Sequence, residues 1–365
     1  MNSLLQEISL LVEDFGSAPK LEEMPKRTLA DKGIAGPTAA HVIEDVHTPL
    51  NLAYLTFTTG TSAFQNIVGV TYAELPARIR ASVRILERAG LKRGDKLLVT
   101  YPPLVNVFSG QALKDFGLKW SFLVRSSRDA FLAALYKERP AAVVGESAFL
   151  RAALTDAKNM GVAEDLPKGV KLLTAGTPLD LELLPVAQEL LQAEVHDLYG
   201  CQEIGWLAMD GIPVRDELTP AAIRGGQQYY ELIAGGLPMG DSFPCSESGH
   251  VCNKAGKIIT YRRERTYPEY EVIVKATTLA SAVTLNRVAR SILRIKGRIV
   301  KVSPEVQVNA EQTILELRGD PISGIEIPSV TITGPVQTEF FDTMVQAQLD
   351  YQQNSKADPV WTKRS

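Results

Sequence analysis

The chain has 365 residues, of which 45% are apolar and 22% are charged, and its formal net charge is −3. That length allows one large or two ordinary domains with substantial hydrophobic cores. No apolar run approaches the roughly 20 residues that a membrane helix needs, and a weakly acidic chain offers no basic field to nucleic acid. The three cysteines cannot form a disulfide framework for this size, which favours a reducing, cytoplasmic compartment. We therefore expect a small-molecule partner, with no nucleic acid and no membrane.

The first 15 residues carry apolar side chains at a helical spacing, interrupted by acidic residues. A secretory signal has basic residues followed by an unbroken apolar stretch. This segment therefore predicts a helix and not an export signal.

Short apolar runs alternate with amphipathic stretches from about Gly94 to Leu198. The runs predict strands, and the stretches predict helices, over these ranges: strands 96–100, 120–124, 141–145, 170–174 and 194–198; helices 104–116, 128–137, 148–158 and 179–191. Helices of this length between strands form right-handed crossovers, which give a mainly parallel sheet covered on both faces. The predicted fold class is therefore α/β.

The sequence after Gly205 is rich in glycine, proline and β-branched residues. This composition predicts a β-rich lobe, with strands over 257–261, 270–275, 299–302, 314–317 and 330–333. A last helix is expected over 340–352.

Two segments carry residues suited to phosphate chemistry. Small hydroxylated residues surround a glycine in Thr58-Thr59-Gly60-Thr61-Ser62, and such a loop lets backbone N–H groups and hydroxyls approach a polyphosphate. The second segment runs from Tyr199 through Gly200 to Glu203 and directly follows the strand predicted over 194–198. Ligands of doubly wound sheets bind at such strand ends. Glu203 could hold Mg²⁺ that bridges phosphates. Each segment taken alone is also compatible with a plain loop.

Together, the two segments resemble the adenylate-forming superfamily of acyl-CoA ligases and adenylation domains. The first is similar to its phosphate loop, and the second to its Y-G-x-T-E motif, in which the tyrosine lies near adenine and the glutamate reaches Mg²⁺. Gly176-Thr177-Pro178 is similar to the adenine-side turn that lies between them, and 89–95 to an A-G-v-x-x-G-D turn. The order of these motifs resembles the phenylacetate-CoA ligase and acyl-protein synthetase branch.

The resemblance implies a large N-terminal domain of the adenylate-forming fold, with parallel sheets flanked by helices and a β-rich lobe. We expect an α/β region with the phosphate loop over 1–205, the β-rich lobe of the same large domain over 206–308, and a reduced C-terminal region over 309–365. Glu264 is the best candidate for the acidic residue that holds the ribose, and Arg287 would match the hinge arginine.

The chain also departs from the family pattern. The lysine of the phosphate loop is absent from 63–65, Gln202 replaces a threonine, and the usual hinge aspartate is replaced. No segment matches the one that carries the catalytic C-terminal lysine, so adenylation would be slow, would be completed by another residue such as Lys356 or Lys363, or would be lost. The basic run over 287–301 is expected to be one solvated face of a strand.

The resemblance implies that ATP and Mg²⁺ activate a carboxylic acid as an acyl-adenylate, which passes to the thiol of CoA or a carrier protein. Glu203 and Thr59 would be catalytic, Glu203 would bind the metal, and the ATP site would comprise Thr58, Gly60, Thr61, Ser62, Gly176, Thr177, Tyr199, Gly200, Glu264 and Arg287. The acid pocket would be lined by Trp206, Phe108 and Tyr101, which favours an aryl acid, although core packing is an alternative for each.

Two other functions stay open from the sequence. The missing lysines are compatible with a catalytically impaired relative that binds a ligand or a protein. An ATP-independent acyltransferase is the other alternative, with Cys201 or a bound thiol as the acceptor. Cys245, His250 and Cys252 offer zinc ligands, but their spacing matches no standard zinc site. A homodimer is compatible with the sequence, which contains no signal that decides it.

Overall fold

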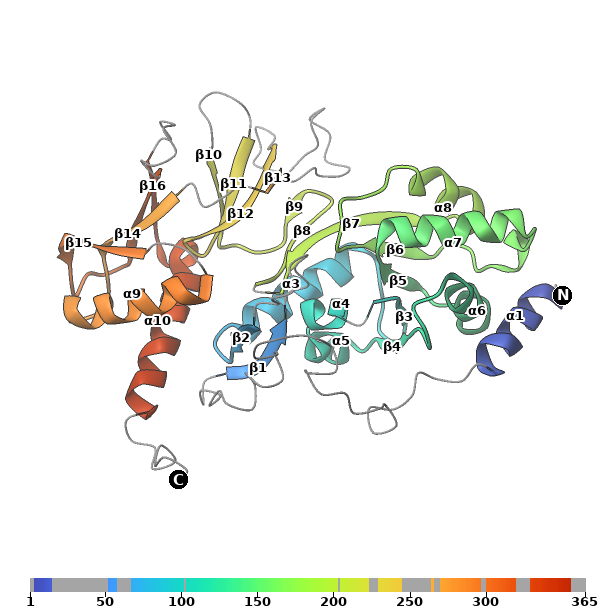
Figure 1. The fold of residues 1–365 in the computed structure, drawn as a ribbon, viewed down its shortest axis with the longest axis horizontal. Helices are drawn as coiled ribbons and strands as arrows, with labels where there is room; N and C mark the ends of the chain where they lie inside the picture. The colour runs from blue at the N-terminus through green and yellow to red at the C-terminus, as the bar shows by residue number, and fades with distance from the viewer. Residues whose placement is uncertain are drawn as a thin grey trace, which may run out of the picture. The chain divides into compact units, whose positions relative to one another are not determined.

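The computed structural model describes residues 3–14, 52–57, 67–101, 103–202, 204–222, 229–244, 264–265, 270–296, 300–319 and 329–355. The chain divides into two compact units (Figure 1). Unit 1 comprises residues 1–48, 57–67 and 78–209, and unit 2 comprises residues 49–56, 68–77 and 210–365. Compactness alone does not define an independently folding domain, so the predicted boundaries after residues 205 and 308 stay predictions.

Unit 1 is built on a mainly parallel sheet. Its strands lie in the order β4-β3-β5-β6-β7-β8, and every neighbouring pair from β4 to β7 is parallel. Only β8 runs antiparallel to its neighbour β7. The strands are β3 (Lys96–Val99), β4 (Lys119–Phe122), β5 (Ala142–Gly145), β6 (Lys171–Thr174), β7 (Glu194–Cys201) and β8 (Gly205–Met209). The predicted α/β class is confirmed.

Helices connect the strands of unit 1 as the sequence pattern predicts. They are α4 (Pro103–Phe108), α5 (Gly110–Phe116), α6 (Arg128–Glu138), α7 (Ser147–Asn159) and α8 (Leu183–Leu191), with a short 3₁₀ helix at Ala163–Asp165. The prediction of one continuous helix over 104–116 is wrong, because helices α4 and α5 occupy this range. Ser109 has a φ of 67°, and this left-handed conformation interrupts the helix.

The N-terminal helix and three crossover helices share one core. Helix α1 (Ser3–Asp14) packs on α6. Its Leu5 is buried in a cluster with residues of α6, α7 and α8 and with Leu98, Val143 and Leu172 of three adjacent strands. These helices therefore cover one face of the sheet, as the alternation of side chains along a strand requires. Among the described residues, no helix combines the length and apolar character needed to cross a membrane.

Helix α3 (Leu75–Arg88) is where the chain passes from unit 2 to unit 1. The sequence analysis did not predict this helix. Strands β1 (Leu52–Phe57) and β2 (Ile67–Thr71), which precede it, pair with each other.

The described residues of unit 2 include two four-stranded sheets and helices α9 and α10. One sheet is antiparallel, in the order β10-β11-β12-β13, and the other is mixed, in the order β15-β14-β16-β17. The elements are β9 (Ile212–Pro213), β10 (Leu218–Ala222), β11 (Tyr229–Ala234), β12 (Leu237–Pro244), β13 (Glu264–Arg265), β14 (Tyr270–Ala276), β15 (Val300–Gln307), β16 (Ile314–Gly319), β17 (Val330–Thr333), α9 (Ala282–Lys296) and α10 (Pro335–Ser355).

The β-rich composition of this part is confirmed, with one correction. The basic run expected on a strand begins on helix α9. Leu285, Val288 and Ala289 are buried while Asn286 and Arg287 are exposed, which is the helical spacing of one apolar face. Helix α9 packs on β15 and on α10. The strand predicted over 257–261 lies outside the described residues.

A buried ionic cluster joins two separate chain segments of unit 2. Arg215 donates hydrogen bonds to Glu217 and to Glu74, with 2.8 Å between Nη1 of Arg215 and Oε1 of Glu74, and all three side chains are buried. Burial alone would lower the pKa of Arg215, but the charges and hydrogen bonds of Glu74 and Glu217 raise it overall. The guanidinium therefore stays charged.

Candidate active site

The sheet of unit 1 has a point at which its strand order reverses. From β3 the chain moves to β4 on one side, and it then crosses back to add β5, β6 and β7 in turn on the other side. In open α/β sheets, ligands bind beyond the carboxyl ends of the strands at such a point. The order of strands therefore places a candidate site beyond β3 and β5.

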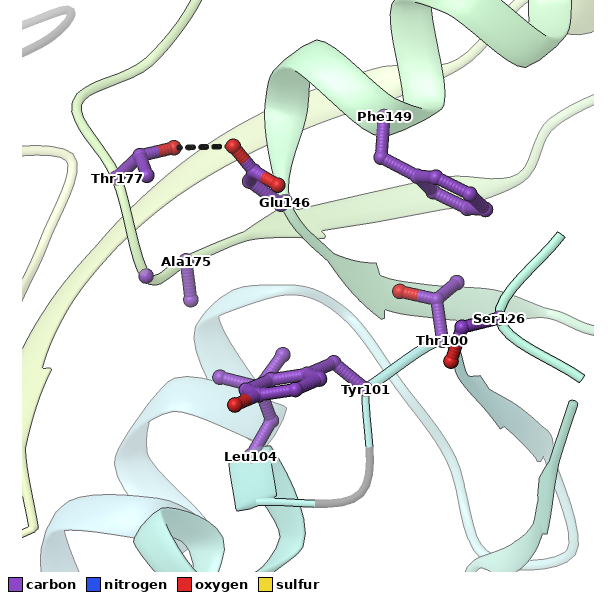
Figure 2. A pocket seen from close by; sticks show the side chains of 9 residues that line it. Thr100, Tyr101, Leu104, Ser126, Glu146, Phe149, Ala175 and Thr177 are labelled. Atoms are coloured by element: carbon purple, nitrogen blue, oxygen red, sulfur yellow. Dashed lines mark hydrogen bonds between the residues drawn. The ribbon is translucent and has the colours of Figure 1, made fainter. Parts of the chain in front are cut away.

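A pocket of about 300 Å³ lies at this position (Figure 2). The residues that line it follow the carboxyl ends of β3, β4, β5 and β6 or begin the next helix. They are Thr100, Tyr101, Leu104, Ser126, Glu146, Phe149, Ala175, Gly176 and Thr177. The volume falls at the lower end of the range for small-molecule sites.

The pocket combines an apolar floor with a polar rim. Leu104 and Ala175 are buried, whereas Ser126, Glu146 and Thr177 are exposed. The Thr177 hydroxyl donates to Oε1 of Glu146 at 3.4 Å, as Figure 2 shows. None of the described lining residues is a lysine or an arginine. This pocket therefore suits a neutral, partly apolar group with a few hydrogen-bonding atoms.

The turn after β6 is held firmly against helix α7. The backbone N–H of Asp180 donates to the Ser147 hydroxyl at 2.9 Å, and that hydroxyl donates to the carbonyl of Pro178 at 3.4 Å. Arg151 also pairs with the Asp180 carboxylate at 2.5 Å. These bonds keep Gly176 and Thr177 at the pocket rim, and Gly176 has a φ of 94°, which glycine adopts readily.

The floor between β3 and β5 is tightly packed. The Thr100 side chain donates to the carbonyl of Val144 at 3.2 Å, and its backbone N–H bonds the same carbonyl at 3.0 Å. A Cβ added at Gly145 would collide with the Thr100 side chain. Gly145 thus allows the close approach that shapes the floor.

The turn between β7 and β8 is also closely packed. Gly200 cannot accept a side chain, because an added Cβ would lie 2.6 Å from Trp206 and 2.7 Å from the carbonyl of Gly205. Trp206 packs edge-on against Phe108 with 4.8 Å between ring centroids. Tyr199, at 1% exposure, is buried. The end of β7 and the start of β8 are therefore tightly packed against each other and against α4.

The structure brings some of the predicted site residues together. Gly176 and Thr177 line the pocket, and Tyr199 and Gly200 lie on β7, which pairs with β6. Arg287 is exposed on α9 of unit 2. The residues of the predicted phosphate loop, Thr58, Thr59, Gly60, Thr61 and Ser62, lie outside the described residues, as do Glu203 and the side chain of Glu264.

The residues proposed for an acid pocket divide into two groups. Tyr101 lines the pocket, whereas Phe108 and Trp206 pack together in the core, which is the alternative role that the sequence left open. Three further pocket residues, Thr100, Ser126 and Glu146, were not predicted. Thr100 ends a predicted strand and the other two follow one, and that position was the available signal.

The described residues also bear on metal binding. They contain no group of three or more His, Cys, Asp or Glu side chains that could hold a metal ion. Mg²⁺ bound to phosphates uses only one or two carboxylates, so a single glutamate is compatible with such a site. Cys201 is partly exposed and forms no disulfide in the described part of the chain; Cys245, His250 and Cys252 lie outside the described residues.

A known enzyme matches the chain along its length. The ACP-SH:acetate ligase of Malonomonas rubra is 54% identical over 374 residues, in an alignment that covers 100% of this chain and 100% of the relative. The chain belongs to the ACP-SH:acetate ligase family. Membership confirms the predicted enzyme class, an acid–thiol ligase, and the resemblance to acyl-activating ligases on which that prediction depended.

Further comparisons give the following similarities. A family described as the MadH C-terminal domain matches residues 210–352 of this chain, which belong to unit 2. A 2-hydroxyisobutyryl-CoA ligase in complex with 2-HIB-AMP and CoA is 14% identical, with a TM-score of 0.44, over 85% of this chain and 86% of that chain. The O-succinylbenzoate-CoA synthetase of Bacillus subtilis in complex with AMP is 16% identical, with a TM-score of 0.42, over 56% of this chain and 62% of that chain.

Proposed function

We propose that this protein activates acetate with ATP and transfers the acetyl group to the thiol of an acyl carrier protein. The observation that carries the proposal is the 54% identity, over both complete chains, to a relative whose name states this acid and this thiol. At this identity the aryl acid favoured by the sequence analysis gives way to acetate as the first acid to test.

The proposed reaction has two steps. An oxygen of the acetate carboxylate attacks the α-phosphorus of ATP, the bond to the bridging oxygen breaks, and pyrophosphate leaves. The thiol sulfur then attacks the acyl carbon, AMP leaves, and the thiol proton passes to solvent. Both steps depend mainly on positioning and on neutralising phosphate charge.

The proposal assigns the phosphates to residues outside the pocket. The lining described above contains no cation, so we assign the polyphosphate to the hydroxyls and backbone N–H groups of residues 58–62, with Thr59 at the reacting phosphate. Mg²⁺, when bound through Glu203, would neutralise the charge on the phosphates. Glu264 and Arg287 stay proposals for the ribose and the hinge.

The volume of the pocket favours the adenosine part of ATP over acetate as its occupant. A water molecule takes up about 30 Å³ of the liquid, so a pocket of about 300 Å³ is several times larger than acetate. Its lining is partly apolar and contains no lysine or arginine, and the hydroxyls and the Glu146 carboxylate offer hydrogen bonds, which suits a nucleoside. The motifs assign Gly176, Thr177, Tyr199 and Gly200 to the adenine side. This assignment is supported by the position of the first two on the pocket rim and of the other two on the neighbouring strand.

The first experiment measures ATP–pyrophosphate exchange with Mg²⁺ and a panel of acids. We expect exchange that depends on acetate and that falls by about 100-fold in Glu203→Gln, because an electrostatic contact to the reacting phosphates is lost. Glu164→Gln changes an exposed glutamate of unit 1 and serves as the matched control. Absence of exchange with every acid would overturn the proposal.

A second experiment identifies the acceptor. Thioester formation is followed with holo acyl carrier protein and with CoA, with and without ATP. ATP-dependent transfer to the carrier protein is expected. Transfer to CoA alone would correct the acceptor, and transfer from acetyl-CoA without ATP would favour the acyltransferase alternative.

A third experiment tests the pocket. Ala175→Leu places a larger side chain on its floor and should raise the KM for ATP by about 10-fold, while the KM for acetate changes little. Ala148→Leu makes the same substitution at an exposed position of α7 and is the control. An increase in the acetate KM alone would assign the pocket to the acid instead.

A further inference from the structure

We infer that Asp180 is a positioning residue that holds two walls of the pocket together. One wall is the turn after β6, which carries Gly176 and Thr177, and another is the start of helix α7, with Glu146 and Phe149 (Figure 2). Asp180 follows the first wall in the chain and bonds to the helix of the second. The inference rests on the proposed function, because it concerns the pocket assigned to adenosine.

The main chain and the side chain of Asp180 both bond to helix α7. Its backbone N–H donates to the hydroxyl of Ser147 at 2.9 Å, and Ser147 is buried. Oδ2 of its carboxylate accepts a hydrogen bond from Nε of Arg151 at 2.5 Å. Ser147 and Arg151 are four residues apart in the helix and therefore share one face. Since a charge-assisted bond is short and directional, Asp180 is fixed against this face at two points.

The same residue also shapes the turn that leads into helix α8. Oδ1 of Asp180 accepts from the backbone N–H of Glu182 at 3.1 Å, and the Asp180 carbonyl accepts from the N–H of Leu183 at 3.0 Å. An aspartate that bonds the backbone two residues later forms a local turn. Arg151 contacts this turn a second time, with 3.1 Å between its Nη1 and Oε2 of Glu182. Asp180 is therefore the residue at which the turn, α7 and the start of α8 meet.

Only two residues separate Asp180 from the rim residue Thr177. One of them is Pro178, whose ring restricts the backbone and whose carbonyl accepts from the Ser147 hydroxyl at 3.4 Å. Thr177 in turn donates to Glu146 on the opposite wall at 3.4 Å (Figure 2). A displacement of Asp180 from α7 must therefore move Thr177 and change the distance between the two walls.

A second ion pair between the same two helices provides a matched control. Lys158 near the end of α7 and Glu189 near the end of α8 lie 2.7 Å apart, and both side chains are half-exposed. Neither is among the described residues that line the pocket. Loss of this pair removes a contact between α7 and α8 without changing the bonds of the turn.

The experiment compares Asp180→Ala with Glu189→Ala in the full-length protein. Three quantities are measured: the Kd of AMP by calorimetry without acid, the KM values for ATP and pyrophosphate in the exchange reaction, and the thermal midpoint. A misplacement of about 1 Å can cost about 100-fold, and we expect the Kd of AMP and the KM for ATP to rise by about 10-fold in Asp180→Ala. The KM for pyrophosphate should stay unchanged, because the phosphates are assigned to residues 58–62. Glu189→Ala should change none of the binding constants.

Two further variants separate positioning from stability. Asp180→Asn keeps an oxygen that accepts from Arg151 and from the N–H of Glu182, so it should recover most of the AMP affinity. Arg151→Met removes the side-chain contact from the other partner and should weaken AMP binding in the same direction as Asp180→Ala. If Asp180→Ala fails to fold, Arg151→Met decides, because Arg151 is partly exposed and its replacement leaves no buried charge.

The outcomes distinguish the inference from the proposed function. An unchanged Kd of AMP in both Asp180→Ala and Arg151→Met would overturn the inference alone, as would an equal rise in Glu189→Ala or a parallel rise in the KM for pyrophosphate. A wild-type protein that binds AMP but shows no exchange with any acid would overturn the proposed function, and the AMP data would still decide on Asp180. A wild-type protein that binds neither AMP nor ATP would overturn both.

Discussion

Asp342 is largely buried, and burial favours its protonated form although two threonine hydroxyls contact its carboxyl group. Thr313 donates to Oδ1 of Asp342 at 2.7 Å, and the Thr338 hydroxyl lies 2.8 Å from Oδ2 and 3.0 Å from the carbonyl of Gly334. The Thr338 hydroxyl has one proton and cannot satisfy both acceptors fully. Burial raises the pKa of Asp342, and the two threonine hydrogen bonds only partly offset this increase.

Asp342→Asn should therefore stabilise the protein at neutral pH. Because the folded state raises the pKa above 3.8, the contribution of Asp342 is favourable at low pH and is lost as the pH rises through the folded pKa. An amide at this position donates to Thr338 and leaves that hydroxyl to bond Gly334. We expect the thermal midpoint at pH 7 to rise by about 2 °C, with no gain at pH 3.

Glu316 gives the opposite sign and serves as the control. Burial raises the pKa of Glu316, but hydrogen bonds from Arg318 and Ser329 lower it overall. Its stabilising contribution is present above the ordinary pKa of 4.5 and is lost as the pH falls through the folded pKa. Glu316→Gln should thus lower the midpoint at pH 7, and equal responses of the two variants would contradict this account.

Gly200→Ala should damage the β7–β8 turn. Its Cβ has no space between Trp206 and the carbonyl of Gly205, so β8 must shift. We expect the thermal midpoint to fall by several degrees, about 2–3 kcal/mol for an overpacked site, and exchange activity to fall with it. Gly110→Ala, at a helix start with open space, should be neutral, and a neutral Gly200→Ala would refute the packing argument.

At the scale of elements, α1 is attached to unit 1 through a narrow apolar face. Leu5 is fully buried in the core with α6, while Leu10 is 55% exposed. Leu5→Ala should cost about 2–5 kcal/mol of unfolding free energy, because a buried cavity is left behind. Leu10→Ala is the control and should cost within about 0.5 kcal/mol. Urea denaturation of full-length variants measures both, and similar small effects would show that α1 does not contribute to the core.

The elements that the sequence predicted well are those with strong periodicity. Strands β3, β5 and β6 are short apolar runs between amphipathic helices, and all were found within one or two residues. Helix α9 was missed because its basic residues resemble the alternation of a strand in the sequence, whereas the buried positions among its described side chains reveal the helical spacing. Helix α3 was not predicted, because only the turn over 89–95, which follows it, was interpreted from the sequence.

The candidate site was predictable only in part, for a physical reason. The glycine and hydroxyl residues of single turns, such as Gly176 and Thr177, can be recognised locally. Glu146 and Ser126 become pocket residues only because β5 and β4 lie on opposite sides of β3. Strand order is a long-range property, and no local pattern specifies it.

At the scale of the whole molecule, unit 2 depends on distant parts of the chain. Residues 68–77 belong to it together with 210–365, and the Glu74–Arg215–Glu217 cluster joins these segments. The segment matched by the MadH C-terminal domain, 210–352, lacks Glu74. We therefore expect that segment to need the earlier residues for full stability.

Arg215→Met should strongly destabilise unit 2. The substitution leaves two carboxylates buried without their cation, and loss of one partner of a buried pair typically costs about 3–5 kcal/mol. The double variant Arg215→Met with Glu74→Gln should recover part of the loss. Arg128→Met, at the exposed pair with Asp156, is the control and should be nearly neutral. Chemical denaturation measures all of these, and equal costs at Arg215 and Arg128 would contradict the role of the cluster.

The loops that build the pocket have a consequence for evolution. Its walls come from segments that follow four different strands, and a loop can change in length or composition without altering the strand pairing beneath it. In the course of evolution, one of these loops can therefore change while the others and the sheet stay the same, and the protein stays folded. Relatives that act on other acids or thiols should differ first in these loops, and their sheets should diverge last.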